Sequence, residues 1–245
     1  MKYGDRTWVE LRDLARAGAA VVVPLGCTEQ QSTHLPVDFD SWFAEELSLA
    51  AAAELDRRGL PTLVLPVLPF GPTPEHRNFG AGYVDLPVSV HEAVVEATVR
   101  SVLTQGFGTV VVWRGCGGHD LRDVVGRLRR STPGHVTIDL PEPPFAQLWT
   151  ACGGPDVAAG HADSFTTSIC LYRRGGDVRT DRIPPPSAAP DWTDPNLDFR
   201  DYTEAGTIGD VSAASAALGA LLWAASVDWL ANHVAGVGEA AASAS

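Results

Sequence analysis

Apolar runs and helical periodicities alternate along the chain. Short runs rich in Val and Leu, closed by Gly, Pro or polar residues, are typical of buried parallel strands. They predict strands at residues 19–25, 63–68, 109–113 and 136–140. Apolar residues at helical spacing predict helices at residues 8–17, 42–55, 89–103, 121–130, 145–152, 165–172 and 211–234. This order predicts an α/β fold, with a mostly parallel sheet between two layers of helices.

Residues near the predicted helix ends carry capping and loop signals. Thr7 can cap the first helix, and Gly18 follows its last turn. Ser89, with Glu92 three residues later, predicts a capping box at the start of the third helix. Residues 70–82 and 183–198 contain prolines that disfavour regular pairing, so we expect loops there, the first of them beside a site.

Length and composition indicate one packed domain. Of the 245 residues, 45% are hydrophobic and 20% charged, which is ordinary for a globular core. We expect a single domain over residues 1–235, and residues 236–245, rich in Ala, Ser and Gly, predict a disordered tail. No apolar run approaches the ~18 residues of a membrane span. The first residues lack the pattern of a signal peptide, which favours a cytoplasmic location.

The charge balance narrows the classes of partner. The formal net charge is −12, and basic residues form no extended cluster. Such a chain repels phosphate backbones and anionic lipid surfaces, so we expect neither a nucleic-acid partner nor membrane binding. The four cysteines lack the C-x-x-C spacing of metal or redox motifs, and we interpret them as reduced thiols.

Residues that could bind a metal or take part in catalysis are most frequent in residues 25–40, which begin at the end of the first predicted strand. Ligands in open α/β sheets bind beyond the carboxyl ends of the strands, which is where Glu29 and Asp40 would lie. These two acids are either solvated loop carboxylates or a pair that holds a cation and transfers protons.

This stretch resembles the signature of the creatininase family, written approximately G-S/T-x-E-Q-H-G-x-H-L-P-x-x-x-D. The matching residues are Gly26, Glu29, Gln30, His34, Leu35, Pro36 and Asp40. Residues 70–76, 160–168 and 206–215 resemble three further family blocks, in the family's order. The resemblance implies a three-layer α-β-α sandwich and hydrolysis of a non-peptide C–N bond in a small, cyclic amide substrate. It also implies divalent metal, zinc or manganese, and a homo-oligomer, often a hexamer.

The metal-binding positions depart from the family pattern. The resemblance implies five ligands, of which Glu29 and Asp40 are present, while Gln31, Cys116 and Ser164 replace the others. Asp163 or Asp120 could compensate for Ser164. A thiolate binds zinc well, so we predict that Glu29, Asp40 and Cys116 hold one zinc ion with an open fourth position. The alternative is that no metal is bound.

Two residues are candidates for catalysis beside Glu29. Cys116 lies between a strand and a helix, where a thiol can act as a nucleophile with His119 or His161 as its base, or can simply fill space beside glycines. His161 matches a family histidine that transfers protons, and an imidazole suits a general base at neutral pH. Without that resemblance it would be a helix cap or a packing residue.

Other residues are predicted to contact the substrate. By resemblance, His34 would support a ligand carboxylate, and Glu75 and His76 would line the pocket. Arg114 replaces an expected Asn and could clamp an anionic substrate group, and His119 follows on the same loop. The leading hypothesis is therefore a creatininase-like amidohydrolase. The alternative is a metal-free cyclase or isomerase that uses Cys116, or a non-catalytic binding subunit.

Overall fold

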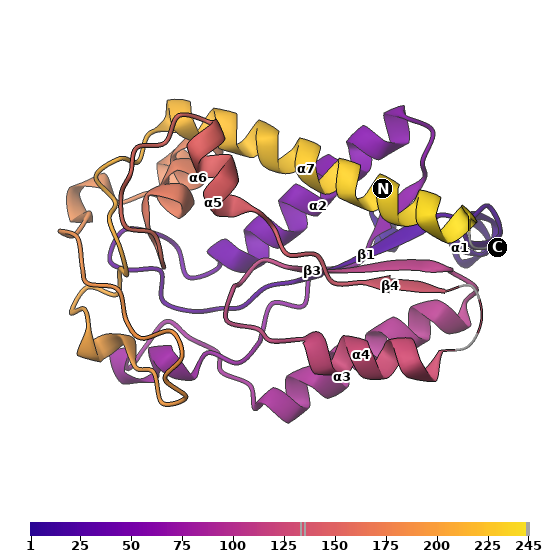
Figure 1. Cartoon of the computed structure of the whole chain (residues 1–245), viewed down its shortest axis with the longest axis horizontal. Helices are drawn as coiled ribbons and strands as arrows, with labels where there is room; N and C mark the ends of the chain where they lie inside the picture. Colours follow the sequence, from indigo (N-terminus) through magenta and orange to yellow (C-terminus); the bar gives the residue numbers. More distant parts are fainter. Residues whose placement is uncertain (133, 135, 244–245) are drawn as a thin grey trace.

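The computed structural model describes residues 1–132, 134 and 136–243, and its centre is a parallel sheet (Figure 1). The four strands lie in the order β2-β1-β3-β4. Their bounds are Ala20–Leu25 for β1, Thr62–Val64 for β2, Thr109–Arg114 for β3 and Thr137–Asp139 for β4. Every residue of β1 is buried, which explains its continuous apolar sequence, because helices cover both faces of a parallel sheet.

Helices pack on both faces of the sheet, as predicted. Figure 1 shows α2 (Phe39–Arg57), α5 (Phe145–Ala151), α6 (Ser164–Arg174) and α7 (Ala216–Ser243) on one side. The other side carries α3 (Val88–Thr104) and α4 (Arg122–Ser131), and α1 (Trp8–Arg16) packs into the same apolar cluster. Val22 faces the first layer, whereas Val21 and Val23 face the second, so alternate positions of one strand supply both cores. The three-layer α-β-α sandwich is confirmed.

One of the two predicted helix caps is present. In α1, Glu10 donates its backbone N–H to the Thr7 hydroxyl, and the Thr7 N–H donates to the Glu10 carboxylate, which completes a capping box. The box predicted at Ser89 is wrong. Helix α3 begins at Val88 with Pro87 as its N-cap, so Ser89 already lies inside the helix. The Pro87 carbonyl accepts hydrogen bonds from the N–H groups of Val90 and His91.

The second strand and the last helix end elsewhere than predicted. Strand β2 stops at Val64 because Pro66 has no N–H to continue the ladder, although Leu68 makes one isolated bridge to Leu25. Helix α7 begins at Ala216 and extends to Ser243, past Val234, because the alanine-rich sequence favours a helix. Residues 244–245 of the predicted tail lie outside the described residues. None of the helices in the described part of the chain is both long and apolar enough to cross a bilayer.

Two glycines let the loops after the central strands approach α2. A Cβ on Gly26 would lie 2.3 Å from the Cα of Ser41, and one on Gly115 would lie 2.4 Å from the carbonyl oxygen of Asp40. The Gly115 N–H also donates to the Leu25 carbonyl at 2.7 Å, so the two loops leave the sheet together. The close packing places the residues after β1, the residues after β3 and the first turn of α2 around one point.

Candidate active site

The structure brings Glu29, Asp40 and Cys116 together at the carboxyl ends of the central strands. With Cys27, their candidate ligand atoms all lie within 4.8 Å of one another, and all four side chains are buried. Glu29 comes from the loop after β1, Asp40 from the first turn of α2, and Cys116 from the loop after β3. The spatial arrangement that the sequence predicted is therefore present, while the chemical roles of these residues stay predictions.

Cys27 is a member of this cluster that the sequence analysis missed. Its sulfur lies 3.0 Å from Glu29 Oε2 and 3.2 Å from Asp40 Oδ2. Burial, the neighbouring Cys116 side chain and the Asp40 carboxylate raise the pKa of the Cys27 thiol, so it remains protonated and can donate to a carboxylate. The available signal was its place directly after Gly26, where the family pattern has Ser or Thr.

Gln31 joins the two carboxylates in place of a family histidine. Its amide nitrogen donates to Asp40 Oδ2 at 2.7 Å and to Glu29 Oε1 at 3.4 Å. The Gln31 carbonyl oxygen is buried without a hydrogen-bond partner among the described residues. An amide N–H cannot act as a metal ligand. Gln31 therefore contacts the Glu29 and Asp40 carboxylates by hydrogen bonds.

Buried acids dominate the electrostatics of the cluster. Burial raises the pKa of Glu29 well above its ordinary value, and the nearby Cys116 and Asp40 raise it further. Burial also raises the pKa of Asp40 to about 6, against hydrogen bonds from Cys27 and Gln31 that lower it. Ionising all of these groups at once would be costly, and either protons or a cation can relieve the repulsion.

Asp40→Asn is expected to stabilise the metal-free protein at neutral pH. A carboxyl whose pKa rises from 3.8 to about 6 on folding contributes stability that is present below about pH 3.8 and lost as the pH rises through about 6. The Asn variant lacks this loss, so its free energy of unfolding should exceed that of the wild type above pH 6, and the gap should close near pH 4. Urea unfolding with a chelator present measures this, with the exposed Asp5→Asn as control. Equal stabilities at pH 8 would contradict the prediction.

Two histidines also lie beside Glu29. His161 Nδ1 lies 3.4 Å from Glu29 Oε1, and His76 Nε2 lies 3.5 Å from Glu29 Oε2. His161 Nε2 donates to the Gln30 carbonyl at 2.7 Å, so in the neutral ring Nδ1 is the acceptor that faces Glu29. Burial lowers the pKa of His161 to about 4 and that of His76, with a further effect of His161, to about 2, so both rings are neutral.

Backbone and side-chain contacts fix these rings. The N–H groups of His161 and Ile208 each donate to the other's carbonyl at 2.9 Å. The Gln30 amide nitrogen donates to His76 Nδ1 at 3.1 Å, and its oxygen accepts from the Ser32 N–H at 2.8 Å. His76 therefore carries its proton on Nε2, which faces Glu29.

The cluster forms part of the wall of a cavity of about 1150 Å³. Near the cluster, its acidic, thiol and imidazole groups come from Glu29, Asp40, Glu75, His76, Cys116 and His161, and four further acids line the rest of the wall: Glu142, Asp156, Asp163 and Asp194. Aromatic side chains also line the cavity, from Phe39, Phe43, Phe145, Trp149, Phe165, Trp192 and Phe199. Polar groups that converge at one side of an apolar cavity are typical of a ligand-binding site.

Two of the residues predicted to bind substrate lie outside the cavity wall. His34 is fully buried, and its Nε2 lies 2.9 Å from the Thr167 hydroxyl on α6, so it packs the loop after β1 against that helix. His119 is also buried behind Cys116, with its ring 4.7 Å from the ring of His91. Loop packing turns both rings inward, so neither reaches the cavity wall, and a substrate contact for these two residues stays a prediction.

Arg114 does reach the cavity wall, but its guanidinium is already engaged. It donates to the His119 carbonyl and to the Glu142 carboxylate, both at 2.6 Å. The acids considered as substitutes for Ser164 do not join the cluster. Asp163 caps α6, and Asp120 pairs with Arg122.

Known proteins of one family match nearly the whole length of this chain. The model of the creatininase family, described as creatinine amidohydrolase, matches residues 4–234. The chain belongs to the creatininase family. Among curated relatives, the mycofactocin precursor peptide peptidase of Mycobacterium tuberculosis is 30% identical over 233 residues, which cover 91% of this chain and 87% of the relative. The peptidase of the same name from Mycolicibacterium smegmatis is 29% identical over 87% of this chain and 83% of its own.

Solved structures of the creatininase family share the fold. A candidate creatinine amidohydrolase from Bacteroides fragilis superposes with a TM-score of 0.83 at 20% identity, covering 97% of this chain and 96% of its own. Creatinine amidohydrolase itself gives a TM-score of 0.80 at 20% identity over 95% and 96% of the two chains. A manganese form of creatininase gives 0.79 at 19% identity over the same shares. This creatininase-family chain thus keeps the fold, with Gln31 and Cys116 at positions where the family pattern has histidines.

Proposed function

We propose that this creatininase-family chain hydrolyses an amide C–N bond in a peptide-like substrate. The observation that carries the proposal is the placement of Glu29, with its carboxylate oxygens 3.4 Å from His161 and 3.5 Å from His76 in the wall of a large cavity. A carboxylate and an imidazole in contact can move a proton from an attacking water to a leaving nitrogen.

The size and lining of the cavity support a peptide-like substrate. Pockets for small ligands measure roughly 300–1000 Å³, and this cavity, at about 1150 Å³, exceeds that range. Its aromatic wall suits apolar side chains better than a small polar ring. The curated relatives that are about 30% identical carry the name of a peptide peptidase. The small cyclic amide predicted from the sequence stays a prediction and enters the experiment as a competing substrate.

The cluster suits one divalent ion. Glu29, Asp40 and Cys116 offer two carboxylates and a sulfur within 4.8 Å of one another, a ligand set that zinc accepts. The residues suit a second ion less well, because the Gln31 amide nitrogen donates hydrogen bonds to the carboxylates of both Glu29 and Asp40. When bound, a zinc or manganese ion would polarise the scissile carbonyl.

The protein's own groups supply the proton transfers. Glu29 in its ionised form takes a proton from the attacking water, and because burial raises its pKa it is a stronger base than an ordinary carboxylate. His161 Nδ1, held as an acceptor by the bond from Nε2 to Gln30, receives that proton and delivers it to the leaving nitrogen.

His161→Asn is expected to lower kcat by at least about 100-fold. Asn can keep a hydrogen bond to the Gln30 carbonyl but cannot accept and release a proton near neutral pH. Steady-state kinetics measure the loss, and His233→Asn on α7, remote from the cavity, is the matched control. Turnover within tenfold of the wild type would mean that another group transfers the proton.

The function itself is tested by assaying short peptides and creatinine with the metal-free protein and after addition of zinc or manganese. We expect metal-dependent hydrolysis of peptides and little or none of creatinine. Hydrolysis of creatinine alone would restore the small cyclic amide as substrate. If no amide is hydrolysed under any of these conditions, the hydrolase proposal fails, and the cyclase, isomerase or binding-subunit alternatives replace it.

A further inference from the structure

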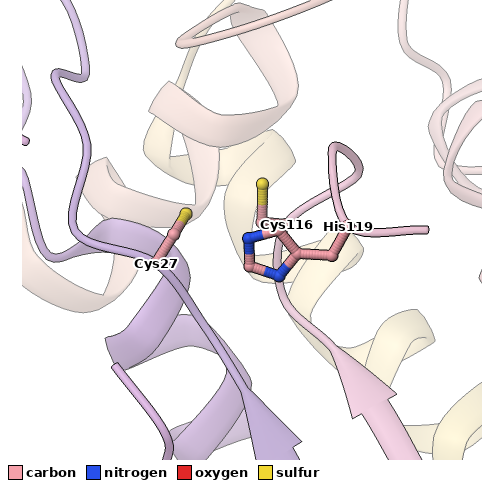
Figure 2. A group of neighbouring side chains, drawn as sticks. All are labelled: Cys27, Cys116 and His119. Atoms are coloured by element: carbon pink, nitrogen blue, oxygen red, sulfur yellow. The ribbon is translucent and has the colours of Figure 1, made fainter. Parts of the chain in front are cut away.

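Cys27, Cys116 and His119 form a grouping that the proposed proton transfers do not use. Their sulfur and ring-nitrogen atoms lie within 4.8 Å of one another, and the three residues are 0%, 8% and 1% exposed. In Figure 2 the Cys27 side chain points toward Cys116 and the ring of His119, which both come from the loop after β3.

The His119 ring is buried without the hydrogen bonds that such a group normally makes. Neither Nδ1 nor Nε2 makes a hydrogen bond of good geometry among the described residues, although the Pro72 backbone lies close enough to the ring to raise its pKa. Buried polar atoms are rarely left unpaired, because each forfeits its hydration without compensation. A ring nitrogen beside two sulfurs would be satisfied by a cation held between them.

The surroundings fix the ring in this position. A Cβ on Gly71 would lie 2.2 Å from ring atoms of His119, so a glycine is required where the ring rests. The ring of His91 packs on it at 4.7 Å between centroids. The His119 carbonyl accepts from Arg114 at 2.6 Å, which holds the backbone of the same residue. The imidazole therefore has little freedom to turn away from the sulfurs.

We propose that Cys27, Cys116 and His119 bind a thiophilic cation, zinc, with the fourth position left to water or to a neighbouring carboxylate. Two sulfurs and one imidazole form a ligand set that zinc favours and that manganese, which prefers oxygen, does not. Each thiol releases its proton to solvent as its sulfur binds the cation, and the two thiolates balance the charge of the ion. The inference rests on the proposed function in one respect, because Cys116 is a metal ligand in both. It adds Cys27 and His119 to the residues that would hold the ion.

Metal binding tests this inference without any assay of turnover. The metal-stripped full chain is titrated with zinc against a chromophoric chelator, and with cobalt(II) while the thiolate-to-cobalt charge-transfer absorption is recorded. We expect one zinc per chain, no displacement of zinc by excess manganese, and a cobalt absorption of the strength that two thiolates give. Cys27→Ser and His119→Gln should each weaken zinc binding at least about tenfold. Cys27→Ser should also lose about half of the charge-transfer absorption, while His119→Gln should keep it.

Control variants and the opposite outcomes distinguish the ligand set of Cys27, Cys116 and His119 from the carboxylate-rich set of the proposed function. Cys152→Ser and His233→Gln, which lie outside the grouping, should bind zinc as the wild type does. If Asp40→Asn and Cys116→Ser lose zinc while Cys27→Ser and His119→Gln keep it, the inference is overturned and the carboxylate-rich site of the proposed function stands. Cobalt absorption of single-thiolate strength in the unaltered chain overturns it without relying on the folding of any variant. Zinc bound as expected, but without amide hydrolysis, supports the inference while the proposed function fails.

Discussion

Glu29→Gln is expected to lower kcat/KM for amide hydrolysis by about 100- to 10,000-fold, the contribution of a positioned acid–base group. Gln has nearly the same shape but cannot take a proton from water. Because burial raises the pKa of Glu29 well above its ordinary value, ionising this carboxyl costs free energy in the metal-free folded protein, and a neutral Gln avoids that cost. The loss of activity should therefore come without a loss of stability, and we expect the free energy of unfolding to stay the same or rise.

Steady-state kinetics and urea unfolding of the same preparations check both halves of this prediction. Glu204→Gln, at an exposed residue outside the cavity wall, is the control for the amide substitution. A Glu29→Gln variant that retains activity within tenfold of the wild type would remove Glu29 from the proposed proton transfer. A variant that is inactive and also much less stable would show a structural role instead.

Trp113→Ala is expected to cost about 3–5 kcal/mol of stability, in the range of large-to-small aromatic substitutions in a core. Trp113 lies on the central strand β3, is completely buried, and packs against Phe145 and Trp229, with ring centroids 6.4 and 6.0 Å away. Truncation would leave a cavity between the sheet, α5 and α7. A loss of this size is a large part of the stability of an ordinary domain.

Denaturant unfolding measures the loss, with two comparison variants. Trp8→Ala, at a side chain that is 73% exposed, should change stability by less than about 1 kcal/mol. Trp113→Phe keeps most of the volume and removes an indole N–H that has no hydrogen-bond partner among the described residues, so it should cost much less than Ala. A Trp113→Ala protein as stable as the Trp8→Ala protein would contradict this account of the core.

Most of the fold could be predicted because its strands and helices have strong local signals. The buried Val runs of β1 and β3 are read directly from the sequence, as is the capping box at Thr7. Where the prediction was wrong, two local signals competed. Pro87 outweighed Ser89 as the start of α3, and the helix propensity of alanine outweighed the glycines at the end of α7.

The site was less predictable because it depends on which way side chains turn at the ends of strands. The convergence of Glu29, Asp40 and Cys116 followed from the resemblance and from the neighbouring positions of β1 and β3. For Cys27 the only sequence signal was its place directly after Gly26, which by itself does not distinguish a site residue from a buried filler residue. For His34 and His119, contacts made across long sequence distances decide the orientation of the ring, and these are not visible in a local motif.

The edges of the sheet limit how copies of the chain could associate. Both outer strands, β2 and β4, have only three residues, and Met1 and Lys2 cover the free side of β2 through bonds to Thr62 and Val64. The outer strands therefore leave few backbone N–H and C=O groups free to pair with a strand of another molecule. This protects the chain from edge-to-edge aggregation. The homo-oligomer expected from the family resemblance would thus assemble through helix and loop surfaces rather than through a continuous intermolecular sheet.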